Sequence, residues 1–582
     1  MENQFWIRKN TIDEKKNIWN LEVAGGLLAS EMGEKLRILA VFRFRECIRR
    51  FPMEAMCFEA EEKRYFAASA QISLPDVFYQ AKELQDADQV CVTFSFCDRE
   101  GMWQKLGEEV YLSGQYFKPK SVKTSFGYRL YRKVSYVCCT LLLPIWLLNG
   151  YFAGKGYIES PYLKEGERGK RAMLYHAHGL VQQITGYGYS VREWKTRYFA
   201  SQYQKACKKV KPVHILFLSE RQPDIGGNLD CIRKSLLQAG EDVEEFIDTR
   251  PVHKLPFSQI RKAAGKAAAA KVIVLEDFYP QLHALSLRRE TEVIQLWHAC
   301  GAFKMFGLSD IGKVQNLKQD TKNHRSYTAA IVSSKQMVPF YSEAFGIAEK
   351  SVLPLGVPRT DIFFDEGYRE EIQKKLYEKY PQLFKKKVVL FAPTFRGGGN
   401  KDAYYPTERF LVDDFLEQLS KDTVLIIKNH PFVKQHFPVS EKNKERVLDL
   451  TGKENINDLL FVTDLLITDY SSSIFEASLL SVPMLFYVFD LDEYMRTRDI
   501  YFDFAAFVPG TQVQDLLALT KEAKRILSEG SAYDLKRFRD YFLGSLDGHS
   551  TERVTAWVRQ HARTCFDDRT TEKAQTRHKE EC

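Results

Sequence analysis

The chain has 582 residues, of which 45% are hydrophobic and 27% charged, and its formal net charge is +8. The length exceeds what one hydrophobic core supports, so three or four folded units are expected. The composition predicts a folded, soluble-type protein. The excess of 84 basic over 76 acidic side chains is too small to indicate a nucleic-acid partner.

The 11 cysteines are scattered along the chain. They include no Cys-x-x-Cys pair, and Cys138 and Cys139 are adjacent, which suits neither a disulfide framework nor a zinc site. Reduced thiols in the cytosol are therefore expected. The N-terminal residues lack the charged-then-apolar order of a signal peptide, so no secretion is predicted.

Residues 1–117 are predicted to form a β-rich accessory module. Segments 17–23, 36–44 and 89–97 are rich in β-branched and aromatic residues, and turn formers separate them. An antiparallel sandwich is the expected architecture. The module contains no catalytic constellation, which favours an accessory or recognition role over an enzymatic one.

Residues 118–209 are predicted to form a basic, amphipathic helical linker. The apolar run 137–148 is shorter than the about 20 residues that a bilayer-spanning helix needs, and Pro144 interrupts it. Basic and aromatic side chains flank the run, as is typical of a segment that lies in a membrane interface. A core helix between two domains is the alternative.

From residue 210 onward, apolar strands alternate with helical segments, a pattern typical of doubly wound parallel α/β sheets. Two Rossmann-like domains are predicted, at 210–360 and 361–566, followed by a polar tail at 567–582 that is expected to be disordered. In such sheets the ligand lies beyond the carboxyl ends of the strands. The residues that follow each strand are therefore the candidate functional residues.

The stretch from Asp464 to Pro483 predicts a buried strand, a turn of three serines and the start of a helix. Free backbone N–H groups and hydroxyls at such a turn suit a phosphate. The alternative is ordinary helix capping, because serine and aspartate also begin helices that bind nothing.

Polar residues also follow three other predicted strands. His298 and Lys304 come after one, Arg396 after the next, and Lys428 and His430 after another. Positive donors around a pyrophosphate and a base near an attacking hydroxyl are what phosphoryl-type transfer requires. Asp490 and Asp492 could form a metal-binding pair, but no further ligands accompany them, which favours a structural or substrate-contacting role.

At these residues the chain resembles the CDP-glycerol glycerophosphotransferase family, whose members prime and polymerise teichoic acid. The resemblance covers roughly residues 210–545 and rests on six stretches in the family's order: 295–304, 355–361, 390–396, 428–431, 468–476 and 483–494. The chain departs from the family's usual pattern after His298, before His430 and before Arg359. These departures leave both histidines and the phosphate ligands in place.

The resemblance implies a GT-B fold with CDP-glycerol held mainly by the C-terminal domain, and it implies no metal and no cofactor. His298 and His430 would be the functionally critical pair. The donor or its phosphates would be bound by Arg396, Lys428, Pro431, Thr468, Asp469, Ser471, Ser472, Ser473 and Glu476. Further substrate contacts are expected at Lys304, Arg359, Asn228 and Gly301.

The predicted function is transfer of glycerol phosphate from CDP-glycerol to a hydroxyl of a membrane-linked teichoic-acid-type or capsular acceptor, with release of CMP. The acceptor would be a lipid-linked glycan or a polyol-phosphate chain, and the enzyme would be peripheral on the cytoplasmic face of the membrane. CDP-ribitol as donor, sugar-nucleotide glycosyl transfer and a non-catalytic scaffold of polymer assembly remain alternatives. The choice between primase and polymerase is open, as is homo-oligomer formation.

Overall fold

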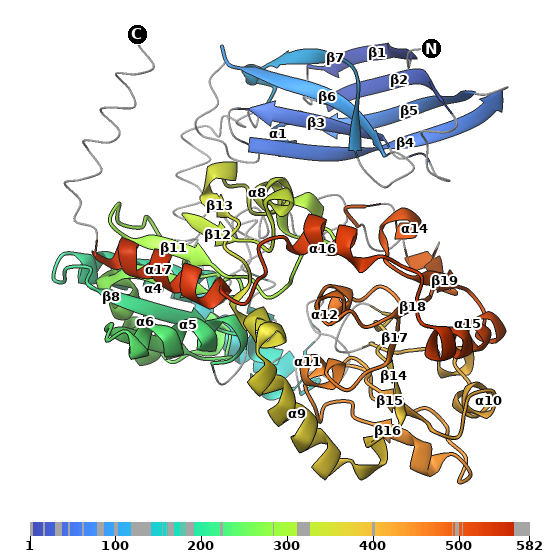
Figure 1. Cartoon of the computed structure of the whole chain (residues 1–582). Coiled ribbons are helices and arrows are strands. Elements are labelled where there is room, and N and C mark those ends of the chain that lie inside the picture. Colours follow the sequence, from blue (N-terminus) through green and yellow to red (C-terminus); the bar gives the residue numbers. More distant parts are fainter. Residues whose placement is uncertain are drawn as a thin grey trace. The chain divides into compact units, whose positions relative to one another are not determined.

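A computed structural model describes most residues between Gln4 and Arg563 (Figure 1). The chain divides into two compact units. The first unit comprises Met1–Lys118, Pro212–Thr249 and Ala269–Cys582, and the second comprises Pro119–Lys211 and Arg250–Ala268. The structure describes all residues except 1–3, 15–17, 29–35, 37, 45–46, 61–62, 78–86, 98–102, 118–140, 154, 159, 161–167, 171, 175, 178–179, 181–190, 222–224, 283–284, 311–325, 398–401, 492, 495–499, 503 and 564–582. The predicted polar tail and the basic start of the linker lie outside the described residues.

The N-terminal module is one antiparallel sheet of seven strands in the order β1-β2-β5-β4-β3-β6-β7. The elements are β1 (Gln4–Asp13), β2 (Ile18–Leu28), β3 (Ile38–Phe44), β4 (Cys47–Ala60), β5 (Lys63–Ser73), α1 (Leu74–Val77), β6 (Gln89–Cys97) and β7 (Trp103–Ser113). The β-rich prediction is confirmed. The expected antiparallel sandwich would have two separate sheets, whereas the strands form one continuous sheet. The sheet is continuous because residues 47–53 of β4 pair with β3 and residues 54–60 pair with β5. Both halves bury side chains in one core that includes Trp19, Phe42 and Phe94.

The first α/β domain contains a parallel sheet in the order β13-β12-β11-β10-β8-β9. Its elements are β8 (His214–Ser219), α5 (Gly227–Gln238), β9 (Val243–Ile247), β10 (Ala270–Leu275), β11 (Glu292–Gln295), β12 (Ala329–Ile331), α8 (Val338–Phe345) and β13 (Val352–Leu353). Helix α17 (Ser550–Arg563) returns to this domain from the end of the chain, and its Val554 and Val558 share a core with β8, β10 and β11 (Figure 1). The end of the predicted 361–566 domain therefore packs on the preceding one.

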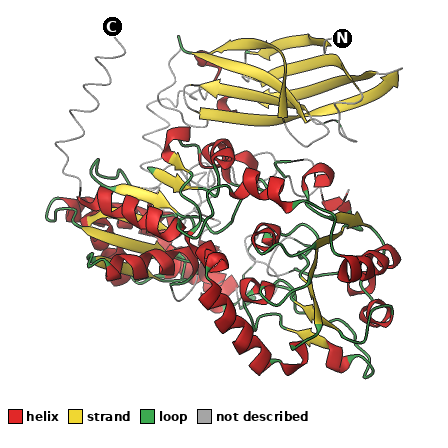
Figure 2. Cartoon of the chain, in the orientation of Figure 1, coloured by secondary structure: helices red, strands yellow, loops and turns green. Residues whose placement is uncertain are grey.

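The second α/β domain has a parallel sheet in the order β16-β15-β14-β17-β18-β19, which is the 3-2-1-4-5-6 order of the Rossmann fold. Its strands lie among helices (Figure 2). The strands are β14 (Lys387–Phe391), β15 (Thr423–Ile427), β16 (Val447–Asp449), β17 (Leu465–Thr468), β18 (Met484–Tyr487) and β19 (Thr511–Val513). The helices are α9 (Glu366–Lys379), α10 (Val412–Glu417), α11 (Ile456–Leu460), α12 (Ser473–Leu479), α14 (Phe504–Phe507), α15 (Leu516–Glu529) and α16 (Leu535–Leu543). The prediction of two Rossmann-like sheets is confirmed.

The second compact unit contains helix α4 (Val191–Cys207) and most of α6 (Phe257–Ala269). Lys195 on α4 donates hydrogen bonds to the carbonyls of His253 and Leu255 at 3.0 and 2.6 Å. Residues 141–153 are also helical. Among the helices that the structure describes, none has both the length and the apolar character needed to cross a bilayer.

Candidate active site

The candidate residues gather at the carboxyl ends of the two parallel sheets. In the first sheet β10 lies between β8 and β11, so Glu276 after β10 and His298 after β11 end on the same edge. In the second sheet the order reverses between β14 and β17. Arg396 follows β14, and the serine turn follows β17. Both sets therefore occupy topological switch points or their neighbours, where open α/β sheets bind ligands.

His298 is held in one orientation by the backbone around it. Trp297 adopts a left-handed conformation with φ 55°, and its carbonyl accepts a hydrogen bond from the buried amide of Asn228 at 2.8 Å. The His298 Nδ1 lies 3.4 Å from the carbonyl oxygen of Glu276. A carbonyl can only accept, so in this contact Nδ1 carries the hydrogen and Nε2 keeps its lone pair. Burial lowers the pKa of His298 to about 4, and the charge of Arg221 adds to this effect.

His430 is held in the opposite tautomer. Its Nδ1 accepts a hydrogen bond from the backbone N–H of Phe432 at 3.2 Å, which leaves the hydrogen of the neutral ring on Nε2. The ring packs against Phe395 and Phe432, with centroids 4.8 and 4.5 Å away. Burial lowers the pKa of His430, and the charge of Lys304 lowers it further. His430 therefore presents a hydrogen-bond donor where His298 presents an acceptor.

The loop that follows His298 contacts the second α/β domain. Lys304 forms a β-bridge with Ile500, and its Nζ lies 5.6 Å from the centre of the Tyr494 ring. Gly301 has φ +59°, and a Cβ at this position would lie 2.5 Å from the ring of Phe475 on α12. The loop that follows His298 thus contacts the domain that carries His430.

Arg359 and Asn228 form hydrogen bonds with the backbone at Trp297 and His298. The Arg359 guanidinium forms an ion pair with Glu476 of α12 and lies 3.4 Å from the carbonyl oxygen of His298. The Asn228 side chain accepts a hydrogen bond from the Arg359 backbone N–H at 2.9 Å. Asn228 is 1% exposed and Glu476 5% exposed. The side chains of Asn228, Arg359 and Glu476 thus contact other parts of the protein, and these contacts hold the backbone around His298 in place. The substrate contacts predicted for these three residues remain predictions.

The Arg396 side chain, which was predicted to bind the pyrophosphate, forms hydrogen bonds with other residues of the protein. Its guanidinium donates to Asp490 through Nε and Nη2 at 2.8 Å, to Asp469 through Nη1 at 2.7 Å, and to the Thr394 carbonyl. The side chain is 9% exposed and lies 5.3 Å from the centre of the Tyr405 ring. The buried Asp469 and the partly buried Asp490 therefore occupy N–H groups that a phosphate would use. One Nη2 hydrogen is left for a ligand.

The predicted ligands around the serine turn differ in their exposure to solvent. Thr468 is buried and donates to the Ala392 carbonyl, and Asp469 accepts from the Thr394 and Tyr470 backbone N–H groups. The Ser471 hydroxyl accepts a hydrogen bond from the Ser473 backbone N–H at 3.2 Å, at the start of α12. Ser472 is exposed, and its side chain makes no capping hydrogen bond.

The segment after β15 contains two more predicted ligands. Lys428 donates to the Leu450 carbonyl at 3.2 Å, and burial lowers the pKa of its ammonium group. Pro431 is exposed beside His430. Asn429 is 2% exposed, yet neither its side-chain oxygen nor its nitrogen has a hydrogen-bond partner among the described residues.

Glu276 is a further candidate residue, one that was not predicted from the sequence. Its side chain is 4% exposed, and its Oε1 has no hydrogen-bond partner among the residues that the structure describes. Its Oε2 lies 3.6 Å from the point where a Cβ on Gly227 would stand. Burial raises the pKa of Glu276 to about 7. The rule that selected His298, a polar residue directly after a buried strand, applies equally to Glu276 after β10.

Two parallel Rossmann-like sheets with basic and polar side chains at their carboxyl ends define the class of α/β proteins that bind ligands at that edge. Residues 200–560 match the sequence profile of the CDP-glycerol:poly(glycerophosphate) glycerophosphotransferase family. The chain belongs to this family.

Among its relatives is a teichoic acid poly(ribitol-phosphate) polymerase of Bacillus spizizenii, 39% identical over 59% of this chain and 56% of the relative. The ribitol-phosphate polymerase TarL of Staphylococcus aureus is 41% identical over 58% of this chain and 61% of the relative. A teichoic acid glycerol-phosphate primase of Bacillus subtilis is 31% identical over 53% of this chain and 77% of the relative. The match thus spans 56–61% of the length of the two polymerases.

The fold is similar to that of the wall teichoic acid polymerase TagF. The TM-score is 0.52 at 18% identity, and the match covers 64% of this chain and 95% of the TagF chain. A histidine variant of TagF gives a TM-score of 0.53 at the same identity, over 63% of this chain and 94% of that chain. These similarities support the GT-B-like arrangement of the two α/β domains.

Proposed function

We propose that the chain transfers a polyol phosphate from a CDP-activated polyol to a hydroxyl of a teichoic-acid-type polymer, with release of CMP. The observation that carries the proposal is the family match over residues 200–560. The opposite tautomers of His298 and His430 support the chemistry, because group transfer needs one proton acceptor and one charge-stabilising donor.

In the proposed reaction the acceptor hydroxyl attacks the phosphorus that bears the polyol. A phosphorus–oxygen bond forms to the acceptor, and the pyrophosphate bond to CMP breaks. His298 Nε2 takes the hydroxyl proton, since its lone pair is available and the low pKa keeps the ring neutral at physiological pH.

His430 would stabilise the charge that builds on the departing CMP. Its Nε2–H is free of the Phe432 contact, and Lys304 supplies a positive charge nearby. Lys428, Pro431 and the turn at Ser471, Ser472 and Ser473 complete the proposed donor site. Arg396, Thr468, Asp469 and Glu476 would contribute mainly by holding this site in shape, since their side chains already bind the protein.

CDP-glycerol is the first candidate donor, because the family takes its name from glycerophosphate transfer. CDP-ribitol is the second candidate. Relatives named as ribitol-phosphate polymerases are 39% and 41% identical to this chain, against 31% for a glycerol-phosphate primase. The donor specificity therefore needs a direct comparison.

Peripheral attachment to the cytoplasmic face of the membrane is part of the proposal. In the helical residues 141–153, Leu141, Ile145 and Leu148 are exposed and recur at helical spacing, which places them on one face. An exposed apolar face of this kind suits shallow insertion between headgroups. This would keep the enzyme beside a lipid-linked acceptor.

The test is release of CMP from purified protein given CDP-glycerol, CDP-ribitol or a UDP-sugar, each with a lipid-linked acceptor analogue and EDTA. We expect CMP from one of the two CDP-polyols. His298→Ala should abolish turnover and retain nucleotide binding, whereas His430→Ala should weaken both. Nucleotide release only from the UDP-sugar, or equal loss of nucleotide affinity in both variants, would contradict the proposal.

A further inference from the structure

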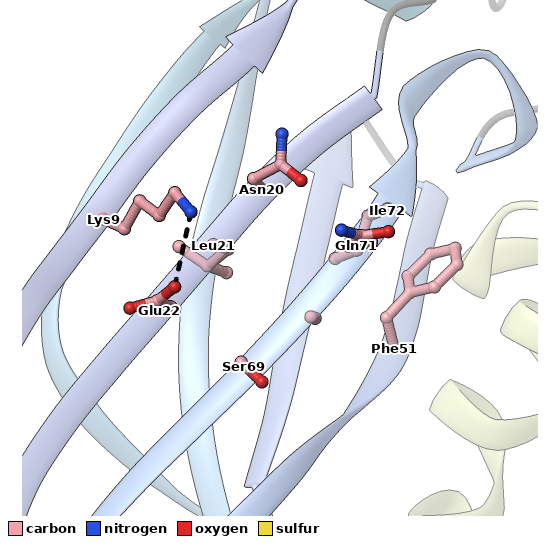
Figure 3. Close-up of a pocket in the computed structure, with 9 residues that line it drawn as sticks. Lys9, Asn20, Leu21, Glu22, Phe51, Ser69, Gln71 and Ile72 are labelled. Atoms are coloured by element: carbon pink, nitrogen blue, oxygen red, sulfur yellow. Dashed lines mark hydrogen bonds and ion pairs between the residues drawn. The ribbon is translucent and has the colours of Figure 1, made fainter.

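The N-terminal module carries a pocket of about 550 Å³ on its sheet (Figure 3). The residues that line it come from β1, β2, β4 and β5, all within this module. Its volume falls within the range of roughly 300–1,000 Å³ that is usual for small-molecule sites. The proposed transfer reaction assigns no role to this part of the chain.

The strand register explains why the pocket is polar. Asn20 on β2 stands opposite Gln71 on β5, and Glu22 stands opposite both Ser69 on β5 and Lys9 on β1. Leu21, between the two polar residues of β2, belongs to the core of the module. Because side chains alternate along a strand, the polar set points away from that core.

Three of the lining side chains are free to bind a ligand. Within the described part of the chain, Asn20, Ser69 and Gln71 have no side-chain hydrogen bond to another residue. An amide or a hydroxyl can donate and accept at once, as the hydroxyl groups of a sugar also do. Phe51 also lines the pocket, and its partly exposed ring packs against Phe42 of the core with centroids 5.4 Å apart.

The charges in the pocket cancel. Lys9 Nζ lies 3.5 Å from Glu22 Oε1, and both side chains are 49% exposed (Figure 3). A polyanionic chain would meet the carboxylate as well as the ammonium group, so it gains little from this pair. We propose that the pocket binds a neutral, hydroxyl-rich ring, namely a sugar unit of a glycan. The proposal goes beyond the transfer reaction and does not depend on it.

Isothermal titration calorimetry on the full chain tests this proposal. The probes are maltose, cellobiose and chitobiose as neutral saccharides, with synthetic poly(glycerol phosphate) as the polyanion. We expect at least one saccharide to bind, with an affinity that salt does not change. Asn20→Ala and Gln71→Ala should each weaken that binding about tenfold, because each removes hydrogen bonds to the ligand. Gln104→Ala is the matched control, since Gln104 is an exposed glutamine on β7 outside the pocket.

Three results would overturn the proposal: no heat from any saccharide, saccharide binding that both pocket variants leave unchanged, or salt-sensitive binding of the polyanion alone. Ser69→Ala, at an exposed position, serves as a third variant if either of the others fails to fold. Circular dichroism checks each fold. CMP release is measured on the same variants and should not change, so failure of the glycan proposal is distinguishable from failure of the proposed transfer.

Discussion

Glu276→Gln should stabilise the protein in a way that grows with pH. Burial raises the pKa of Glu276 to about 7 from the 4.5 of an exposed glutamate. Between these values the folded chain holds a proton that the unfolded chain has released, so stability falls as pH rises through this window. The difference, 7 minus 4.5, is 2.5 pKa units, which corresponds to about 3 kcal/mol at full ionisation. Glutamine has the same shape and carries no charge, so it avoids this loss.

Thermal unfolding of wild type and Glu276→Gln, from about pH 5 to about pH 8, measures the effect. The two Tm values should differ least at the acid end and by about 3 °C at the alkaline end, where glutamine is the more stable, because the entropy of unfolding grows with the size of the unit. Glu366→Gln is the control, because it removes one negative charge from a side chain that is 78% exposed. A Tm difference that is the same at both ends of the range would refute the idea of a buried, unpaired carboxylate.

Arg396→Ala should lower the Tm as well as turnover, because it removes the charged partner of the buried Asp469 and of the partly buried Asp490, at a cost of about 3–5 kcal/mol. Lost turnover with an unchanged Tm would instead indicate that Arg396 acts mainly on the donor. Gly301→Ala should reduce kcat about 100-fold by displacing the loop after the proposed base, since its Cβ would meet an aromatic ring of α12. Gly452→Ala, with φ +72° and open space around it, should keep kcat. Ile145→Asp should reduce pelleting with anionic liposomes, because it places a charge on the exposed apolar face of residues 141–153. Leu517→Asp, at an exposed apolar position on α15, should leave pelleting unchanged. Equal pelleting of both variants would contradict the interfacial helix.

The strands and the positions of the histidines were predictable because their signals are local. The run Leu465–Thr468, apolar except for its last residue, forms strand β17. Strands of parallel sheets are covered on both faces, so they appear as continuous apolar runs. Topology then fixes which end of each strand faces the ligand, and this placed His298 and His430 at the carboxyl edges.

The partners of the site residues were not predictable because they lie far away in sequence. Arg396 binds Asp469 and Asp490, which are 73 and 94 residues further along the chain. The return of α17 to the first α/β domain has no local signature either, since an amphipathic helix does not specify which sheet it covers. The tautomers of the histidines depend on single backbone groups, the Glu276 carbonyl and the Phe432 N–H.

The pH dependence of kcat/KM tests whether His298 is the base. A base must be deprotonated, so activity should fall with acid only through the pKa of about 4 that burial and Arg221 give His298. The opposing charge of Asp277 raises that pKa, and Arg359 lowers it. Arg221→Gln should therefore move the acid limb upward, while burial keeps it below the value of an exposed histidine. The profiles are measured in the Glu276→Gln background, so that this carboxyl adds no limb of its own. An acid limb that does not move when Arg221 is replaced would assign the titration to another group and remove His298 from the role of base.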